Sequence, residues 1–115
     1  MRTTTEVIHD HLMNRLAGDV EKDIRNYHAD VVELTGSGIY RGHDGVRSCA
    51  QELARLVGPA VFTYTHTLID GDFAYLEWTA HNDEVHVGDG ADSFVVRDGA
   101  IVLQTIHYTV LAAQE

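Results

Sequence analysis

The only proline of the chain, Pro59, marks the point where the spacing of apolar residues changes. Before it, apolar residues recur at three- and four-residue intervals, which is typical of amphipathic helices; after it, they alternate with polar residues, which is typical of strands. Gly58 and Pro59 together end a helix, since glycine favours the left-handed cap and proline cannot continue the helical hydrogen bonds. We therefore expect an α+β protein, with helices packed on one face of a mostly antiparallel sheet.

Three helices are expected before Pro59. Residues 4–17 have apolar side chains at helical spacing and are followed by Gly18, a helix stop signal. Asp19 can cap a short second helix that carries Tyr27, and Asp44 can cap a third that ends before Pro59. The apolar stripe of the first helix consists of Ile8, Leu12 and Leu16.

The remaining chain reads as strands joined by tight turns. Residues 30–41 contain two glycines between β-branched segments, which indicates a strand, a turn and an extended return. Four strands follow Pro59, in residues 61–70, 71–83 and 91–110, and Arg97-Asp98-Gly99 is a hairpin signal within the last range. No linker or repeat divides residues 1–115, so we expect a single domain.

Both faces of the expected sheet carry apolar side chains. Ala74 and Trp78 lie on one face of the second long strand, whereas Phe73 and Tyr75 lie on the other. A sheet with one solvated face alternates cleanly between apolar and polar residues, and this one does not. We therefore expect a homodimer that covers the outer sheet face, because twofold dimers are the commonest oligomers.

Charge and hydropathy argue against several kinds of partner. The formal net charge of −10 repels nucleic acid and anionic membrane surfaces, and no apolar run is long enough to span a membrane. The N-terminus lacks the apolar segment of a secretory signal, and the only cysteine, Cys49, has no intramolecular partner for a disulfide. These features predict a cytoplasmic protein in which Cys49 is a packed, unreactive thiol.

Three stretches resemble the nuclear transport factor 2-like superfamily in its SnoaL-like branch: AGDVEKDIRNYHADVV, YRGHDGVRS and DSFVVRDGAIVLQTIHYTV. Together, in this order and at this spacing, the resemblance extends over almost the whole chain. The resemblance implies a cone-shaped α+β barrel with a pocket between the sheet and the helices. It does not specify one activity, because the superfamily includes polyketide cyclases, ketosteroid isomerase, epoxide hydrolases, dehydratases and non-catalytic dimeric modules.

The resemblance also suggests positions for pocket residues. Ketosteroid isomerase uses a tyrosine on the first helix, an aspartate base and a protonated aspartate; aligned without gaps, these fall at His11, Thr35 and Asp92. Only one acid is kept, so ketosteroid isomerase activity is not expected. The acid that SnoaL places on the last strand falls at Ile106, so that acid is absent. His107 next to it is expected on the dimer face, with the pocket as the alternative, because one step along a strand reverses the face.

Three residues are candidates for acid–base catalysis. His11 and Asp92 can form an oriented base and acid, although a histidine and a carboxylate can equally form a structural pair. Asp92 can also be a turn residue. Glu77, between Leu76 and Trp78, is either a pocket carboxylate or a solvated or cross-strand-paired one. The expected ligand-binding residues are Arg15, Tyr27, Thr35, Tyr64, His66, Tyr75, Phe94, Gln104, Ile106 and Tyr108.

The histidines do not predict a metal site. His9 and His11 are separated by about 200° around a helix and cannot chelate one ion together, and no HExxH-type spacing occurs. We expect no metal and no cofactor. Two hypotheses remain: a cofactor-independent cyclase, isomerase or dehydratase acting on a small hydrophobic molecule, and a non-catalytic ligand-binding or dimerisation module.

Overall fold

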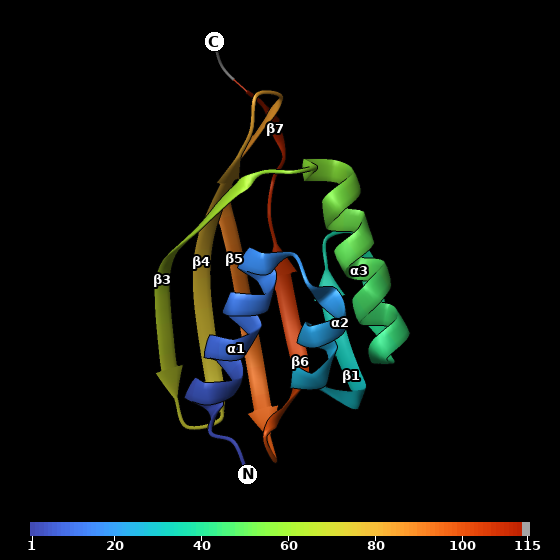
Figure 1. Ribbon diagram of the computed structural model, residues 1–115, viewed down its shortest axis with the longest axis vertical. Coiled ribbons are helices and arrows are strands. Elements are labelled where there is room, and N and C mark those ends of the chain that lie inside the picture. Colours follow the sequence, from blue (N-terminus) through green and yellow to red (C-terminus); the bar gives the residue numbers. More distant parts are fainter. Residues whose placement is uncertain (114–115) are drawn as a thin grey trace.

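One curved, open sheet forms the back of the molecule, and helices lie against one of its faces (Figure 1). The computed structural model describes residues 1–113. The elements in chain order are α1 (Thr4–Ala17), α2 (Val20–Asp23), the 3₁₀ helix η1 (Ile24–Asn26), β1 (Tyr27–Thr35), β2 (Gly38–Arg41), α3 (Gly42–Val57), β3 (Val61–Asp70), β4 (Phe73–His81), β5 (Val85–Arg97), β6 (Ala100–His107) and β7 (Leu111–Ala112).

The strands follow the order β2-β1-β6-β5-β4-β3, and β7 pairs with the beginning of β5. The β1 and β6 strands are parallel, and all other neighbouring strands are antiparallel. This arrangement confirms the α+β class with helices on a curved, mostly antiparallel sheet. The sheet does not close on itself, and a cavity lies between its inner face and the helices.

Helix α1 begins and ends where the sequence predicts. Thr3 and Glu6 form a reciprocal capping box, with N–O distances of 2.9 and 3.1 Å, and Gly18 takes the left-handed conformation at the other end. The buried face of α1 differs from the predicted stripe, because Leu16 is 57% exposed whereas His11 is 3% exposed. The helix therefore turns a polar side chain toward the sheet.

The end of the second helical segment and the N-cap of the third helix differ from the sequence prediction. The helical segment after Asp19 ends at Asn26, so Tyr27 is the first residue of β1 instead of a helical residue. Asp44 is not the cap of α3, which begins at Gly42; its carboxylate lies inside the first turn and pairs with Arg47 at 2.8 Å. As the third residue of the helix, Asp44 lies beyond the N-cap position, which Arg41 occupies.

The core lies between the inner sheet face and the helices. Val7 and Ile8 of α1 and Val46 of α3 are buried against sheet residues such as Leu76 and Ile101. Burial of this apolar surface holds the helices on the sheet. No helix within residues 1–113 is long and apolar enough to cross a membrane.

Candidate functional site

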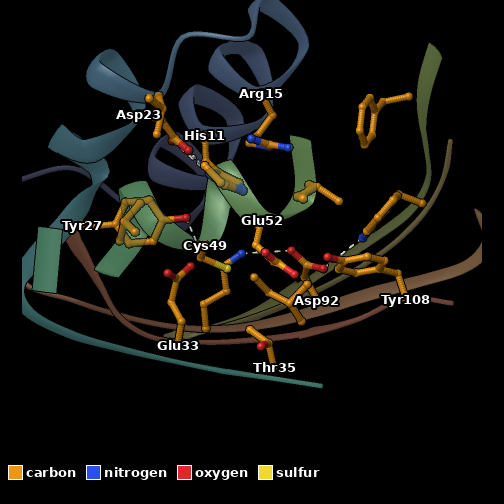
Figure 2. A pocket seen from close by; sticks show the side chains of 18 of the residues that line it. His11, Arg15, Asp23, Tyr27, Glu33, Thr35, Cys49, Glu52, Asp92 and Tyr108 are labelled. Carbon is orange, nitrogen blue, oxygen red and sulfur yellow. Dashed lines mark hydrogen bonds and ion pairs between the residues drawn. The ribbon is translucent and has the colours of Figure 1, made fainter. Parts of the chain in front are cut away.

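A small cavity lies between the helices and the inner sheet face, and polar side chains converge on it from both sides (Figure 2). His11, Arg15 and Asp23 approach from the helices, whereas Glu33 and Asp92 approach from the sheet. The cavity volume is about 60 Å³. An apolar cavity of about 150 Å³ holds one benzene in another protein, so a ring-sized ligand requires this cavity to widen.

His11 and Asp23 form a buried pair. His11 Nδ1 lies 2.9 Å from both carboxylate oxygens of Asp23, and each residue is 3% exposed. A carboxylate accepts hydrogen bonds, so the short contact favours the imidazole tautomer with the proton on Nδ1. In that tautomer, Nε2 carries a free lone pair. The rings of Tyr27 and Phe94 pack edge-on against the imidazole and fix its plane.

Asp92 is held by two donors at the floor of the cavity. Trp78 Nε1 donates to Oδ1 and Gln104 Nε2 donates to Oδ2, each at 2.9 Å. Tyr27 in turn donates its hydroxyl proton to Gln104 Oε1 at 2.6 Å. Burial raises the pKa of Asp92, and the two donated hydrogen bonds and the nearby His11 and Arg15 oppose that rise. These hydrogen bonds connect the side chains of Tyr27, Gln104, Asp92 and Trp78 in a continuous series. The series forms a polar floor of the cavity.

Trp78 reaches Asp92 because its cross-strand partner, Gly90, has no side chain. A Cβ atom at Gly90 would lie 2.3 Å from Cδ2 and 2.4 Å from Cε2 of the Trp78 indole. The glycine thus lets the indole lie flat over β5 and direct Nε1 toward Asp92, two residues further along that strand.

Glu33 is the unpaired carboxyl group of the site. It is 2% exposed, and its Oε1 atom is buried without a hydrogen-bond partner among the described residues. Burial, together with the negative charges of Asp92 and Asp23, raises its pKa to about 8. Glu33 is therefore mostly protonated at neutral pH and can donate a hydrogen bond into the cavity.

Aromatic and sulfur-bearing side chains form the less polar walls. The rings of Phe62 and Tyr108 both pack against the Trp78 ring, at centroid distances of 5.6 and 5.7 Å. The guanidinium of Arg15 lies 5.9 Å from the centre of the Phe62 ring, within cation–π range. Burial raises the pKa of Cys49 to about 12, so its thiol stays protonated and unreactive, in agreement with the sequence prediction.

No group of three or more histidine, cysteine, aspartate or glutamate side chains in residues 1–113 is arranged to hold a metal ion. Apart from Glu33, the buried acidic groups of the cavity are bound by neighbouring side chains: Asp23 by His11, and Asp92 by Trp78 and Gln104. The cavity therefore contains proton donors and acceptors among apolar side chains, and general acid–base chemistry requires such groups.

The sequence profile of the SnoaL-like domain family matches residues 8–104, which include the cavity-lining parts of α1, α2, α3, β1, β3, β4 and β5 and Gln104 of β6. The chain belongs to this family. No curated protein sequence matches the chain.

Solved structures share the fold of this SnoaL-like protein at low sequence identity. A nuclear transport factor 2-like protein of unknown function from Burkholderia xenovorans has a TM-score of 0.78 and 17% identity, covering 97% of this chain and 87% of that chain. A protein from Kribbella flavida, provisionally named a ketosteroid isomerase, gives 0.77 and 17%, with coverage of 97% and 81%. A Sinorhizobium meliloti protein, provisionally named a polyketide cyclase, gives 0.74 and 14%, with coverage of 88% and 93%.

The structure brings together most of the residues that the sequence predicts for the SnoaL-like pocket. His11 and Asp92 line the same cavity but do not pair; His11 binds Asp23, and Asp92 binds Trp78 and Gln104. The predicted ligand-binding residues that also line it are Arg15, Tyr27, Thr35, Tyr64, Gln104, Ile106 and Tyr108.

Four predicted residues do not line the cavity. Glu77 and Tyr75 lie on the outer sheet face, where the Tyr75 hydroxyl donates to Glu77 Oε2 at 2.7 Å, so Glu77 is a surface carboxylate with a neighbour on its own strand. A bulge after Tyr64 places His66 opposite Glu77 and therefore on the outer face as well. Phe94 is buried in the core behind the His11 ring.

Sequence reasoning missed Glu33 and Asp23. Glu33 lies two residues before Thr35 on the same face of β1, because side chains alternate along a strand. The ungapped alignment places a base at Thr35, so a shift of two positions would have found the carboxylate. Asp23 gives no such signal, because its approach to His11 depends on how α2 folds back on α1.

Proposed function

We propose that this SnoaL-like protein is a cofactor-independent acid–base enzyme that binds a small, largely apolar molecule with a carbonyl or hydroxyl group. The observation that carries the proposal is Glu33, a buried, unpaired and mostly protonated carboxyl group in the same cavity as the oriented His11. An unpaired buried polar group costs free energy of folding, so its presence is better explained by a ligand than by stability. The enzyme names of two proteins with this fold are consistent with the proposal.

The two groups take complementary roles in the proposed reaction. Glu33 donates a hydrogen bond to the carbonyl oxygen of the ligand, and His11 Nε2 accepts a proton from the adjacent carbon. The electron pair of the broken C–H bond moves into the carbonyl, forming an enol or enolate. Asp23 stabilises the imidazolium that results. Return of the proton from His11 to a different atom of the ligand completes an isomerisation. In a dehydration, the hydroxyl group on the next carbon takes this proton from His11 and leaves as water, and the electron pair of the enolate forms the new carbon–carbon double bond.

The activity test is proton exchange of simple ketones in D₂O, followed by mass spectrometry, with cyclohexanone and 2-tetralone as one-ring and two-ring probes. We expect the native protein to accelerate deuterium incorporation next to the carbonyl. Glu33→Gln and His11→Gln should each slow the catalysed rate by about a hundredfold or more, because each removes one partner of the proton transfer.

Ligand binding can be followed separately, because Trp78 is the only tryptophan and lines the cavity. Fluorescence quenching by a ketone that undergoes no catalysed exchange would favour the second candidate function, a non-catalytic binding module. That alternative has support in the structure, since both Asp92 oxygens and the His11 Nδ1 atom are already satisfied within the chain. Equal exchange rates for native protein and Glu33→Gln would contradict the enzyme proposal.

We further propose that a second copy of the chain covers the outer sheet face. Leu34, Leu68 and Phe73 are each more than 40% exposed on that face, beside the half-buried Val95 and Leu103. An apolar patch on an open sheet face can pack against the same patch of a second copy about a twofold axis, and a monomer seldom leaves a large patch of this kind in water.

Sedimentation at micromolar concentration tests this dimer. We expect twice the chain mass of 12.8 kDa for the native protein and for Met13→Glu, a control in which an equally exposed apolar residue of α1 is replaced. Phe73→Glu should weaken association by about a hundredfold or more, because each interface buries the charge twice. A native monomer, or a Phe73→Glu variant as dimeric as Met13→Glu, would exclude this interface.

A further inference from the structure

Behind His11, a chain of polar side chains runs from the cavity wall to the N-terminal segment. Asp23, which binds His11, also accepts a hydrogen bond from Asn26 Nδ2 through its Oδ1 atom, at 3.1 Å. The same amide nitrogen donates to Asp10 Oδ2 at 2.8 Å. On its other side, Asn26 Oδ1 accepts from Arg2 Nη1 at 2.6 Å. One side-chain amide thus contacts two carboxylates and one guanidinium.

The partners of Asn26 leave its amide no freedom to turn. Carboxylates accept and a guanidinium donates, so the amide nitrogen must face Asp10 and Asp23 while the oxygen faces Arg2. Both N–H groups and the oxygen are used, and the residue is 0% exposed. Arg2 is itself fixed by hydrogen bonds to the backbone oxygens of Gly99 and Arg25, at 3.0 and 3.3 Å. The orientation of the amide is therefore set by the tertiary structure.

We propose that Asn26 is a positioning residue, which holds Asp23 against His11 so that the imidazole presents a proton-free Nε2 to the cavity. This inference rests on the proposed function, in which Nε2 is the base. The geometry acts in two ways. The Asn26 bond prevents the Asp23 carboxylate from turning away from Nδ1, and it shares the negative charge that would otherwise bind a second proton on the imidazole.

Asn26 also separates two negative charges. Asp10 and Asp23 each accept from the same amide group, so the donor lies between carboxylates that would otherwise face each other without a positive partner in between. Arg2 counterbalances them from the far side of the amide. Asn14 donates to Asp10 at 3.0 Å, with no hydrogen bond to Asp23, and so offers a matched control within the same chain of side chains.

The test is the protonation state of His11, measured at neutral pH from the two ¹⁵N resonances of its ring, which needs no substrate. The reference value is the ratio, in the native protein, of the form with Nδ1 protonated and Nε2 free to all other forms. In Asn26→Ala, the ratio of that form to all others should fall by about tenfold, the typical effect of one hydrogen bond to a charged group. Asn14→Ala should leave the ratio within about twofold of native.

Arg2→Met keeps the inference testable if Asn26→Ala does not fold. That change leaves Asn26 in place but removes the donor to its Oδ1 atom and the positive charge that counterbalances Asp10 and Asp23. The ratio should therefore fall in the same direction, by about threefold. The inference is wrong if the folded Asn26→Ala protein, or Arg2→Met in its place, keeps the native ratio, or if Asn14→Ala changes it equally. Ketone exchange is scored independently: a native protein with the expected His11 state but no exchange would overturn the proposed function alone.

Discussion

Glu33→Gln should make the protein more stable, and the gain should grow with pH. We expect the free energy of unfolding to rise by about 3 to 5 kcal/mol at pH 8.5 and by about 1 kcal/mol at pH 5. For a chain of this size, the gain at pH 8.5 corresponds to roughly 10 °C or more in Tm. Thermal unfolding followed by circular dichroism at the two pH values measures the difference directly.

The sign follows from proton binding in the two states. The pKa of Glu33 is about 8 in the folded protein and near the ordinary 4.5 in the unfolded chain. Between these values the native state binds more protons than the unfolded state, so the native protein loses stability as pH rises from about 4.5 through 8. Glutamine is never ionised and lacks this pH dependence. Its amide is similar in size to the protonated carboxyl group, so little else changes.

Glu77→Gln is the control for this prediction. Glu77 is exposed on the outer sheet face, so the same chemical change should alter stability by less than about 0.5 kcal/mol at either pH. An equal effect of the two substitutions would show that net charge, not the burial of Glu33, governs the response. A Glu33→Gln protein that is less stable than native at pH 8.5 would mean that the carboxylate is ionised and paired in solution.

The expected stabilisation bears on function. A carboxyl group that lowers the free energy of unfolding near neutral pH is expected to serve another purpose, and active sites are where such groups are concentrated. Glu33→Gln is therefore expected to separate the two properties, with higher Tm and lower ketone exchange. A purely structural carboxyl group would not couple these changes in opposite directions.

The sequence predicted the architecture well because the relevant signals are local. Each signal depends on neighbouring residues alone. The signals are the spacing of apolar residues on the two sides of Pro59, the helix stop at Gly18 and the hairpin turn before Gly99. The Tyr27 and Asp44 predictions were wrong where tertiary contacts overrode local preference. In addition, β5 begins at Val85, six residues before the expected start, because its first part is stabilised by pairing with β4 and β7.

The residues of the candidate site were predictable only where a side chain could be assigned to the inner or the outer face of the sheet. Asp92 and Thr35 were placed by the resemblance to ketosteroid isomerase, and both line the cavity. Glu77 was misplaced because one step along a strand reverses the face, and its neighbour Trp78 is the residue that points inward. The Asp23 and Asn26 contacts with α1 could not be predicted, since they depend on the turn that folds η1 back on that helix.

The close approach of β4 and β5 at Gly90 leads to the last prediction, that Gly90→Ala should destabilise the protein by about 2 to 4 kcal/mol. The new methyl group would overlap the Trp78 indole, which must then move off β5. Movement of the ring breaks the Nε1 bond to Asp92 and leaves a buried carboxylate oxygen without its donor.

Both consequences of Gly90→Ala can be measured, because Trp78 is the only fluorophore of its kind in the chain. Emission should shift to longer wavelength in the folded variant, and the denaturant midpoint should fall. Gly36→Ala is the matched control: a Cβ atom there meets nothing within 4 Å, so both readouts should stay at native values. Trp78→Leu in the Gly90→Ala background should recover part of the loss, since the smaller side chain removes the overlap but not the missing donor. If Gly90→Ala costs no more than Gly36→Ala, the indole does not lie against Gly90 in solution, and the floor of the cavity is not held by this contact.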